Sequence, residues 1–288
     1  VREFQPDWIN LQFTPGTFRD GRFFLPSLLT LARIFRRQTA PICLTAHESA
    51  RVLISGNTWR NRALGYLRRF EIETGLKKLR PAKVFVSNSQ HGTDLARAGL
   101  APTPLPILSN IPRGPRPESS PGPEVPVDVR IALIFGRISV DWNPYPVLSA
   151  LAAETGEASG PLAIVSVGEV GHRDLGWQSV VRVATTLGLS THRLGTLPSE
   201  TISSWMQCAT YGISPTPFAL WQKSGACAAM LLHDLPMIFS DETPNDGQLL
   251  PPRFASIQGN KLEWLDAPKA RRAVPTTPDE LWAKMALR

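Results

Sequence analysis

The sequence predicts an α/β protein made of two Rossmann-like domains, and three observations lead to this prediction. Short apolar runs alternate with longer helical patterns along the 288 residues. One stretch dense in Pro, Gly and Ser interrupts the alternation, which then restarts. Hydrophobic residues make up 42% of the chain and charged residues 19%, so a folded core is expected rather than disorder. Strands that alternate with helices form parallel sheets, because each helix returns the chain across a face of the sheet.

The first half contains four strand candidates and three helical patterns. The strands are expected at residues 8–13, 41–46, 83–87 and 105–109. The helices are expected at residues 26–37, 57–79 and 91–99. Ligands gather at the carboxyl ends of parallel strands, so the turn at residues 14–17 and the pair His47-Glu48 become candidates for a site.

The second half repeats the pattern. Strands are expected at residues 129–135, 162–167, 192–195, 211–214 and 235–240. Helices are expected at residues 145–154, 177–187, 199–208 and 224–233. The loops after these strands include Gly136-Arg137, residues 168–172 and residues 215–225, which are further candidates for a site.

The stretch at residues 112–123 is the clearest domain boundary, because its Pro and Gly content stops helices and central strands. We therefore expect an N-terminal domain at residues 1–115, a linker at 116–127 and a C-terminal domain at 128–288. The chain opens on a polar stretch with no signal peptide and without Met. We expect the first strands of the N-terminal domain to be missing from it.

Positive charge is concentrated in the first half. The net charge is +7, and residues 1–120 hold 18 Lys and Arg against 8 Asp and Glu. This balance favours an anionic partner, such as a phosphate, an anionic lipid headgroup or a nucleic acid. The basic helix at 57–79 has two explanations, contact with anionic lipid or a solvated helix that covers the first core. No apolar run approaches the ~20 residues that span a bilayer.

The cysteines Cys43, Cys208 and Cys227 are odd in number and far apart. They match neither a disulfide framework nor a metal site, and the five His residues show no metal-ligand spacing. Buried thiols in a reducing, cytoplasmic setting are expected.

The segment around Lys223-Ser224-Gly225 is the strongest candidate for phosphate binding. A strand leads into a loop there, and a helix begins at Ser224. The free N–H groups of a first helical turn attract an anion, and Gly225 permits close approach. Lys223 is unfavourable beside a helix N-terminus unless an anion binds there. The alternative is an ordinary helix cap with an exposed lysine.

Three other stretches are weaker candidates for a functional site when each is considered alone. Arg137 follows a glycine at a strand end, where its planar guanidinium could hold a diphosphate. Residues 194–200 could offer backbone groups to a nucleobase, or could simply be a connecting loop. His47 could act as a general base or contact a sugar hydroxyl, although a lone His is more often structural.

Together these stretches resemble the family 4 glycosyltransferases, which have the GT-B fold. The resemblance covers most of the chain and depends on the order and spacing of several motifs. These are Pro6-Asp7 before an apolar strand, Leu44–Glu48, Val84–Ser89, Asn110–Gly114, Phe135-Gly136-Arg137, Leu194–Pro198, Lys223-Ser224-Gly225 with Ala228–Met230, and Leu235–Ile238.

The resemblance implies two parallel sheets facing across a cleft and a hexosyltransferase-like enzyme that retains the sugar's configuration. The donor would be a nucleotide-diphosphate sugar, and no metal or other cofactor would be obligatory. The acceptor would be a glycan, a lipid or a small molecule, with the protein cytoplasmic or peripheral at the inner membrane surface. The implied catalytic residues are His47, Arg137 and Lys223.

The binding residues that the resemblance implies fall into three groups. Those for the donor phosphates are Arg137, Lys223, Ser224, Gly225 and Ala226. Those for the nucleobase are Gly168, Gly195, Thr196 and Leu197. Those on the acceptor and sugar side are Gly16, Thr17, His47, Glu48 and Asn88.

Three departures from the family pattern keep an alternative open. Trp221 and Ala229 stand where many members have two glutamates, which contact the sugar and the ribose. The lysine that often follows the Gly-Arg pair is missing, and so is the glycine-rich acceptor loop. The alternative is a catalytically weak or inactive GT-B-like protein that binds a nucleotide or glycan as a partner. A nucleic-acid-binding protein is a third possibility, which we set aside because no known sequence module for it is present.

Overall fold

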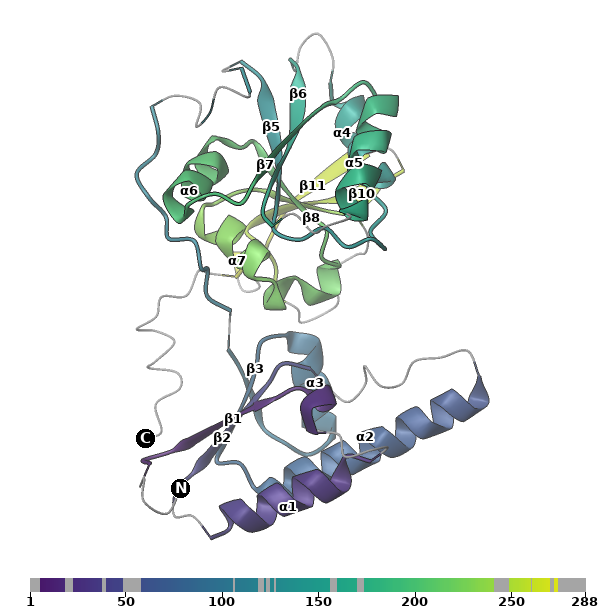
Figure 1. Ribbon diagram of the computed structural model, residues 1–288, viewed down its shortest axis with the longest axis vertical. Coiled ribbons are helices and arrows are strands. Elements are labelled where there is room, and N and C mark those ends of the chain that lie inside the picture. Colours follow the sequence, from purple (N-terminus) through teal and green to yellow (C-terminus); the bar gives the residue numbers. More distant parts are fainter. Residues whose placement is uncertain are drawn as a thin grey trace. The chain divides into compact units, whose positions relative to one another are not determined.

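The computed structural model confirms an α/β fold with two compact units, residues 1–106 (unit 1) and 107–288 (unit 2). Figure 1 shows the elements of each unit. The structure describes residues 6–18, 23–37, 40–48, 58–105, 107–118, 122, 125–126, 128–155, 160–169, 174–240, 249–259, 261–269 and 272–273. Residues 170–173, which include His172, and about half of the linker expected at 116–127 lie outside these ranges.

Unit 1 contains one parallel sheet with the strand order β1-β2-β3-β4. The strands are β1 (Ile9–Phe13), β2 (Ile42–Ala46), β3 (Lys83–Val86) and β4 (Pro102–Pro104). The helices are α1 (Leu25–Phe35), α2 (Trp59–Leu79) and α3 (Ser89–Arg97), with a short 3-10 turn at Pro15–Phe18. One core joins apolar side chains of β1, β2 and β3 to all three helices.

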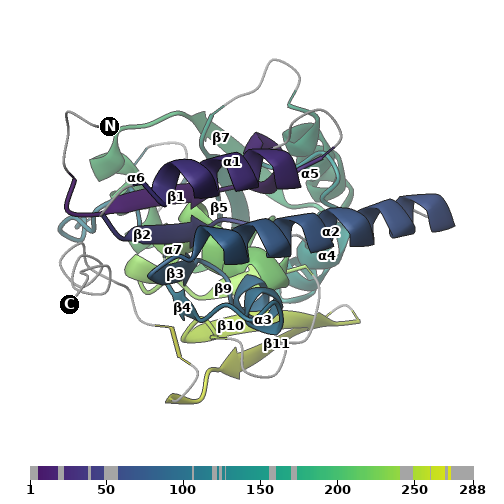
Figure 2. The same cartoon turned by 90° about the horizontal axis from the view of Figure 1, so that it is seen from below.

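Helices α1 and α2 lie side by side in unit 1 (Figure 2). They approach closely at Gly75, where a Cβ atom would lie 2.5 Å from Leu28 Cδ1. The buried carboxylate of Glu71 on α2 accepts a hydrogen bond of 3.4 Å from the backbone N–H of Phe24, the residue before α1. A carboxylate is favourable there, because the first turn of a helix presents unpaired N–H groups.

The expected strand at residues 105–109 is wrong. The fourth strand is β4, three residues that include Pro102 and Pro104. A proline cannot donate to a ladder, so residues with proline are poor candidates for a strand. The edge position of β4 permits them, because only one side of the strand must pair.

Unit 2 contains a seven-stranded sheet with the order β11-β10-β9-β8-β5-β6-β7. The strands are β5 (Arg130–Phe135), β6 (Leu162–Val167), β7 (Ser190–Gly195), β8 (Tyr211–Ser214), β9 (Met237–Phe239), β10 (Arg253–Gln258) and β11 (Lys261–Asp266). Among the strands that the structure describes in this sheet, only the β10–β11 pair is antiparallel. This pair is absent from the strands expected from sequence.

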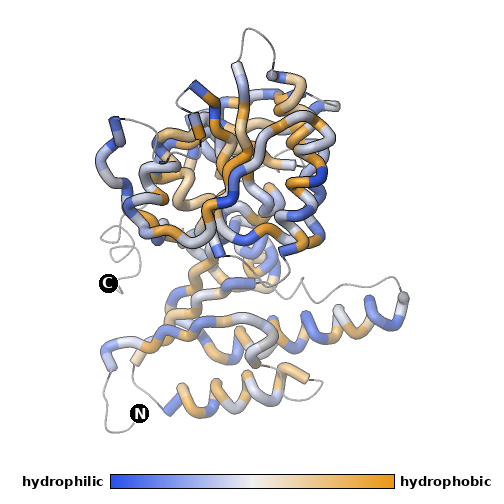
Figure 3. The backbone as a smooth tube through the Cα atoms, turned by 45° about the horizontal axis from the view of Figure 1, so that its top comes forward, coloured by the Kyte–Doolittle hydropathy of each residue, from blue (hydrophilic) through white to orange (hydrophobic). Residues whose placement is uncertain are grey.

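Helices cover both faces of the second sheet. They are α4 (Tyr145–Ala153), α5 (Leu175–Thr186), α6 (Ser199–Cys208) and α7 (Gly225–Leu232). Alternation along β5 sends Leu133 into a core with α6 and α7, and Ile134 into a second core with α4 and α5. This is the doubly wound arrangement of a Rossmann-like unit. Figure 3 shows hydrophobic and hydrophilic stretches interspersed along the chain of this unit.

Free thiols are confirmed for all three cysteines, and Cys43 and Cys227 are buried. Burial raises the pKa of each thiol above its usual value. A raised pKa keeps these thiols protonated. Because the thiolate is the nucleophilic form, these side chains are suited to packing in the core and not to nucleophilic catalysis.

Candidate functional site

The candidate site of unit 2 is at the carboxyl ends of four adjacent parallel strands, β8, β5, β6 and β7. The loops after β5, β6 and β7 carry Gly136-Arg137, Gly168 and residues 195–197. The chain after β8 leads through a 3-10 helix at Phe218–Lys223 into α7. The sheet topology therefore brings all the predicted donor-side residues to one edge.

Three glycines hold these loops against one another. The backbone N–H of Gly136 donates to Val167 O at 2.8 Å, and that of Gly168 donates to Gly195 O at 2.9 Å. A Cβ atom on Gly168 would lie 3.0 Å from both Cα and O of Gly136. Gly168 has φ of +145° and Gly136 has φ of +89°, values that favour glycine at both positions. Only the absence of side chains lets the two loops touch.

The same loop also reaches the first turn of α7. A Cβ atom on Gly136 would lie 3.6 Å from Cβ of Ala226. A Cβ atom on Gly225 would have no atom within 4 Å, so open space lies next to the helix start. The structure thus brings Gly136-Arg137 and the start of α7 together, with room beside Gly225.

Ser224 is the N-cap of α7, as expected. Its Oγ accepts a hydrogen bond of 3.3 Å from Cys227 N. The N–H groups of Gly225 and Ala226 belong to the same first turn, where a helix has no partners of its own for them. They are the groups that an anion would contact at this position.

Two cationic side chains lie at this edge. Lys223 is half-buried and ends the 3-10 helix immediately before the Ser224 cap. Arg137 is exposed and follows the Gly136 loop. A cation near a helix N-terminus opposes the helix dipole, so these charges are better accommodated when an anion lies between them and the helix.

The predicted base-side residues follow β7. Gly195 has φ of +69° and accepts the bond from Gly168. Thr196 is exposed, and Leu197 is half-buried against the core that contains α6 and α7. The loop is therefore fixed at both ends and exposed at its middle.

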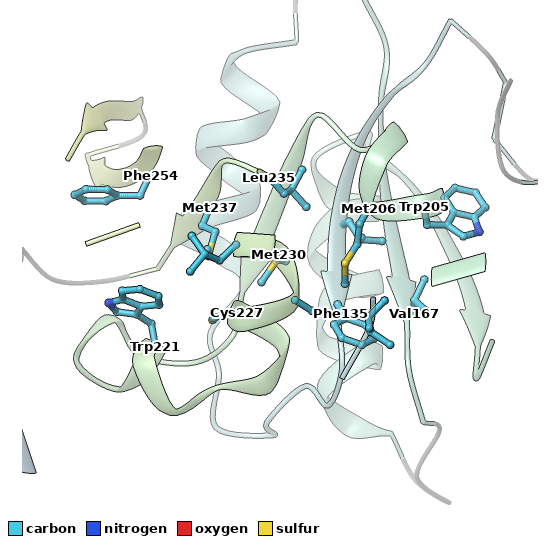
Figure 4. Close-up of a cluster of buried hydrophobic side chains, with 14 of the residues drawn as sticks. Phe135, Val167, Trp205, Met206, Trp221, Cys227, Met230, Leu235, Met237 and Phe254 are labelled. Atoms are coloured by element: carbon cyan, nitrogen blue, oxygen red, sulfur yellow. The ribbon is translucent and has the colours of Figure 1, made fainter. Parts of the chain in front are cut away.

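Trp221 and Ala229, which stand where the sequence resemblance would place two glutamates, are both core residues. Trp221 is 4% exposed and donates from Nε1 to Leu249 O at 3.3 Å, and Ala229 is fully buried. Figure 4 shows Trp221 in the same apolar cluster as Cys227 and Met230. A glutamate at either position would require burial of a carboxylate in this core.

In unit 1, the residues predicted on the acceptor side follow β1, β2 and β3, which pair in parallel. His47 is exposed, and its Nε2 lies 2.5 Å from Gln12 Oε1. Thr17 is exposed in the 3-10 turn with Gly16, and its Oγ1 donates to Thr14 O at 2.6 Å. His47 and Thr17 therefore share one edge of the first sheet.

Glu48 and Asn88 occupy the same edge but differ from His47 in burial. Glu48 is half-buried after β2. Asn88 is 1% exposed, and its Oδ1 accepts hydrogen bonds from Gln90 N at 2.7 Å and His91 N at 3.4 Å. Asn88 is thus the N-cap of α3, and this is its structural role.

Sequence reasoning missed several polar contacts around the site. Thr216 Oγ1 donates to Ser224 Oγ at 3.4 Å. Arg193 on β7 forms an ion pair with Asp174, the N-cap of α5, and its guanidinium lies 5.6 Å from the ring centroid of Trp177. Thr216 is eight residues before the Ser224 cap and Arg193 is 19 residues after Asp174, so neither contact had a local sequence signal.

No family model and no curated protein sequence matches the chain. Among solved structures it resembles a sucrose-phosphate synthase from Thermosynechococcus elongatus, with a TM-score of 0.54, 14% identity, and coverage of 88% of this chain and 61% of that one. Anabaena HepE in complex with UDP and glucose has a TM-score of 0.49 and 12% identity over 82% of this chain and 63% of that one.

The lipopolysaccharide outer core galactosyltransferase WaaB in its apo form has a TM-score of 0.48 and 13% identity, and covers 90% of this chain and 63% of its own. The chain spans about three fifths of the length of these proteins. The likeness to the synthase establishes the fold class, two Rossmann-like units of the GT-B type.

Proposed function

We propose that this chain is a glycosyltransferase that takes a sugar from a nucleotide-diphosphate donor. One observation carries the proposal: the loop of Gly136-Arg137 lies beside the first turn of α7, where a Cβ atom on Gly136 would be 3.6 Å from Ala226 Cβ, with open space beside Gly225. Two cations and a helix N-terminus on one sheet edge suit a diphosphate. The likeness in fold to a sucrose-phosphate synthase, with a TM-score of 0.54, supports a sugar as the group that is transferred.

The proposed chemistry is stabilisation of a leaving group. When the bond from the sugar to the diphosphate breaks, negative charge grows on the diphosphate oxygens. Arg137, Lys223 and the N–H groups of Gly225 and Ala226 would stabilise that charge. Such fixed positive groups supply the stabilisation that a metal ion provides elsewhere, so we propose transfer without an obligatory metal.

The remaining roles follow the family resemblance. Gly168, Gly195, Thr196 and Leu197 would hold the nucleobase, and Ser224 would complete the phosphate site. Gly16, Thr17, His47, Glu48 and Asn88 would serve the acceptor and sugar side, with His47 nearest the transferred sugar. We propose a family 4, hexosyltransferase-like enzyme with retention of configuration, divided into domains at 1–115 and 128–288.

The acceptor class that the positive first half favours is one presented at an anionic surface. We therefore propose a cytoplasmic protein that contacts the inner membrane surface peripherally, with a lipid-linked or glycan acceptor. The charge of residues 1–120, with 18 Lys and Arg against 8 Asp and Glu, supports this location.

The experiment that tests the donor site is thermal unfolding with UDP, GDP and ADP. A ligand that binds only the folded state stabilises it by about 2.7 kcal/mol at a hundred times its Kd. We expect at least one diphosphate to raise Tm. Lys223→Ala should weaken its affinity by about tenfold or more, because a charge-assisted hydrogen bond is lost.

Lys261→Ala is the matched control, since Lys261 is an exposed lysine on β11 of the same unit. The two substitutions remove the same charge, so only a local role separates them. Stabilisation by none of the three diphosphates would refute the donor site. Equal affinity in both variants would refute the role of Lys223.

The buried positions of Trp221 and Ala229 favour a second candidate, a GT-B-like protein that binds the donor without turnover. Incubation with the matching nucleotide-sugar separates the two. Released diphosphate supports the transferase, whereas diphosphate binding without release over a long incubation supports the binding protein.

A further inference from the structure

Helix α2 has two apolar sides, and only one of them is covered by unit 1. The covered side consists of Gly65, Ile72, Leu76 and Leu79, which are buried. The N-terminal part of the helix extends past the end of α1 (Figures 1 and 2). Residues 59–64 and 66–67 are exposed there.

The second apolar side is a stripe of exposed residues, named here the outer stripe: Trp59, Ala63, Tyr66, Leu67 and Phe70. They recur every three or four positions, so they share one side of the helix. At 3.6 residues per turn this side is opposite the covered one. Trp59 is 75% exposed, Phe70 63%, Tyr66 60% and Leu67 47%. Contiguous aromatic exposure of this kind marks an interaction surface.

Arginines flank the outer stripe. Residues 59–70 contain Arg60, Arg62, Arg68 and Arg69 and no acidic residue. By helical spacing, Arg60 lies next to one edge of the outer stripe, and Arg62 and Arg69 lie next to the opposite edge. The guanidinium of Arg60 lies 5.7 Å from the ring centroid of Trp59, and Arg69 pairs with Glu73 at 2.6 Å. Figure 3 shows hydrophilic and hydrophobic stretches alternating along α2.

We propose that the outer stripe lies on a bilayer surface that carries anionic headgroups. Trp and Tyr prefer the boundary between headgroups and acyl chains, and flanking arginines reach the phosphates while their stems cover apolar surface. None of the described helices is long and apolar enough to cross a membrane. The helix would therefore lie in the plane of the surface.

The composition of the stripe favours lipid over nucleic acid. A nucleic-acid surface needs aromatic planes that stack on bases, whereas Ala63 and Leu67 offer only aliphatic surface between the rings. The inference rests on the peripheral contact proposed above, and it is independent of sugar transfer.

The test is co-sedimentation of the full chain with vesicles of phosphatidylcholine and phosphatidylglycerol mixed about three to one. The wild type should bind these vesicles and should not bind pure phosphatidylcholine. Arg60→Gln with Arg62→Gln should reduce binding about 25-fold, since each arginine near an anionic surface contributes about fivefold. Tyr66→Ala should reduce binding about fivefold, because a ring leaves the interface.

Both changes have matched controls in this chain. Tyr145→Ala removes a tyrosine ring that is 51% exposed in unit 2, against 60% for Tyr66. Arg182→Gln with Lys261→Gln lowers the net charge by the same amount at exposed positions away from the stripe. The controls should bind vesicles like the wild type, and all variants should keep the wild-type Tm because the altered side chains are exposed.

Equal binding by Tyr66→Ala and Tyr145→Ala would overturn the proposal, and so would equal binding of neutral and anionic vesicles. A dimer that Tyr66→Ala dissociates, or single-stranded RNA binding that it abolishes while vesicles are ignored, would assign the stripe to another partner and would also overturn it. Diphosphate stabilisation is measured on the same samples. Vesicle binding without diphosphate binding would refute the donor site and would still support membrane binding by the outer stripe.

Discussion

At the scale of single residues, the candidate donor site depends on glycines that allow backbones to touch. Gly136 and Gly168 both have positive φ, and their loops are in contact. Sequence reasoning found both residues because glycine follows each strand. It could not find the contact between them, because a sequence gives the ends of strands and not the distance between two loops. The Ser224 cap was predictable, because a cap is a local feature.

Gly168→Ala should destabilise unit 2 and weaken diphosphate binding. Its Cβ would lie 3.0 Å from Cα and O of Gly136, and backbone atoms cannot yield as a flexible side chain would. Gly188→Ala is the control, because Gly188 has φ of +71° with no atom within 4 Å of a Cβ. Urea unfolding should show a loss about 1–3 kcal/mol larger for Gly168→Ala. Equal losses of unfolding free energy in the two variants would mean that backbone strain alone destabilises the protein and that the contact between Gly168 and Gly136 contributes nothing.

His233 predicts a pH dependence of stability. It is buried, its Nε2 lies 2.8 Å from Ser203 Oγ, and its Nδ1 lies 2.8 Å from Ala229 O. Burial lowers the pKa of His233 below its usual value, and the positive charge of Arg113 acts in the same direction. Asp234 and the bond to Ala229 oppose this shift without reversing it.

The sign follows from proton uptake. Below about pH 6.5 the unfolded chain binds a proton that the folded chain resists, so stability is lost as the pH falls. We expect the free energy of unfolding to fall by up to about 1.4 kcal/mol per pH unit from this one group. His233→Gln should be less stable at neutral pH and should lose less on acidification. Parallel pH profiles of the two proteins would contradict the assignment.

At the scale of elements, sequence periodicity located every α-helix of the described chain and most strands to within a few residues, but not the 3-10 helix at Phe218–Lys223. The failures have physical causes. Strand β4 contains two prolines, which only an edge position tolerates. Strands β10 and β11 pair on either side of Gly259, where φ is +61°. The sequence Gly259-Asn260 between two runs rich in alternating polar and apolar residues was a readable hairpin signal.

The α1–α2 packing makes a prediction that opposes helix propensity. In an isolated helix, alanine is favoured over glycine by about 1 kcal/mol. At Gly75 the added Cβ would meet Leu28 Cβ at 2.6 Å, so the two helices must separate. We expect Gly75→Ala to cost about 1–3 kcal/mol. Ala63→Gly, at an exposed position of the same helix, measures propensity alone. A stabilised Gly75→Ala protein would show that α1 and α2 do not pack this closely.

At the scale of the whole molecule, each unit has its own core. The core of α1, α2 and α3 belongs to unit 1, and the two cores on either face of the larger sheet belong to unit 2. The candidate donor residues are all in unit 2, and the outer stripe is in unit 1. Independent cores allow separate unfolding transitions, as is common for chains of more than one domain.

Calorimetry should therefore resolve two unfolding transitions. A nucleotide diphosphate should raise the Tm of only the transition that belongs to unit 2. Two of the variants above assign the transitions to the units. Gly75→Ala should lower the Tm of the transition of unit 1, and Gly168→Ala should lower the Tm of the transition of unit 2. The diphosphate should shift the transition that Gly168→Ala lowers, because the contacts with Gly136 and α7 are made by residues of that unit. A diphosphate that raised the Gly75→Ala-sensitive transition instead would place the nucleotide in unit 1. A single transition lowered by both variants would show that the two cores unfold as one.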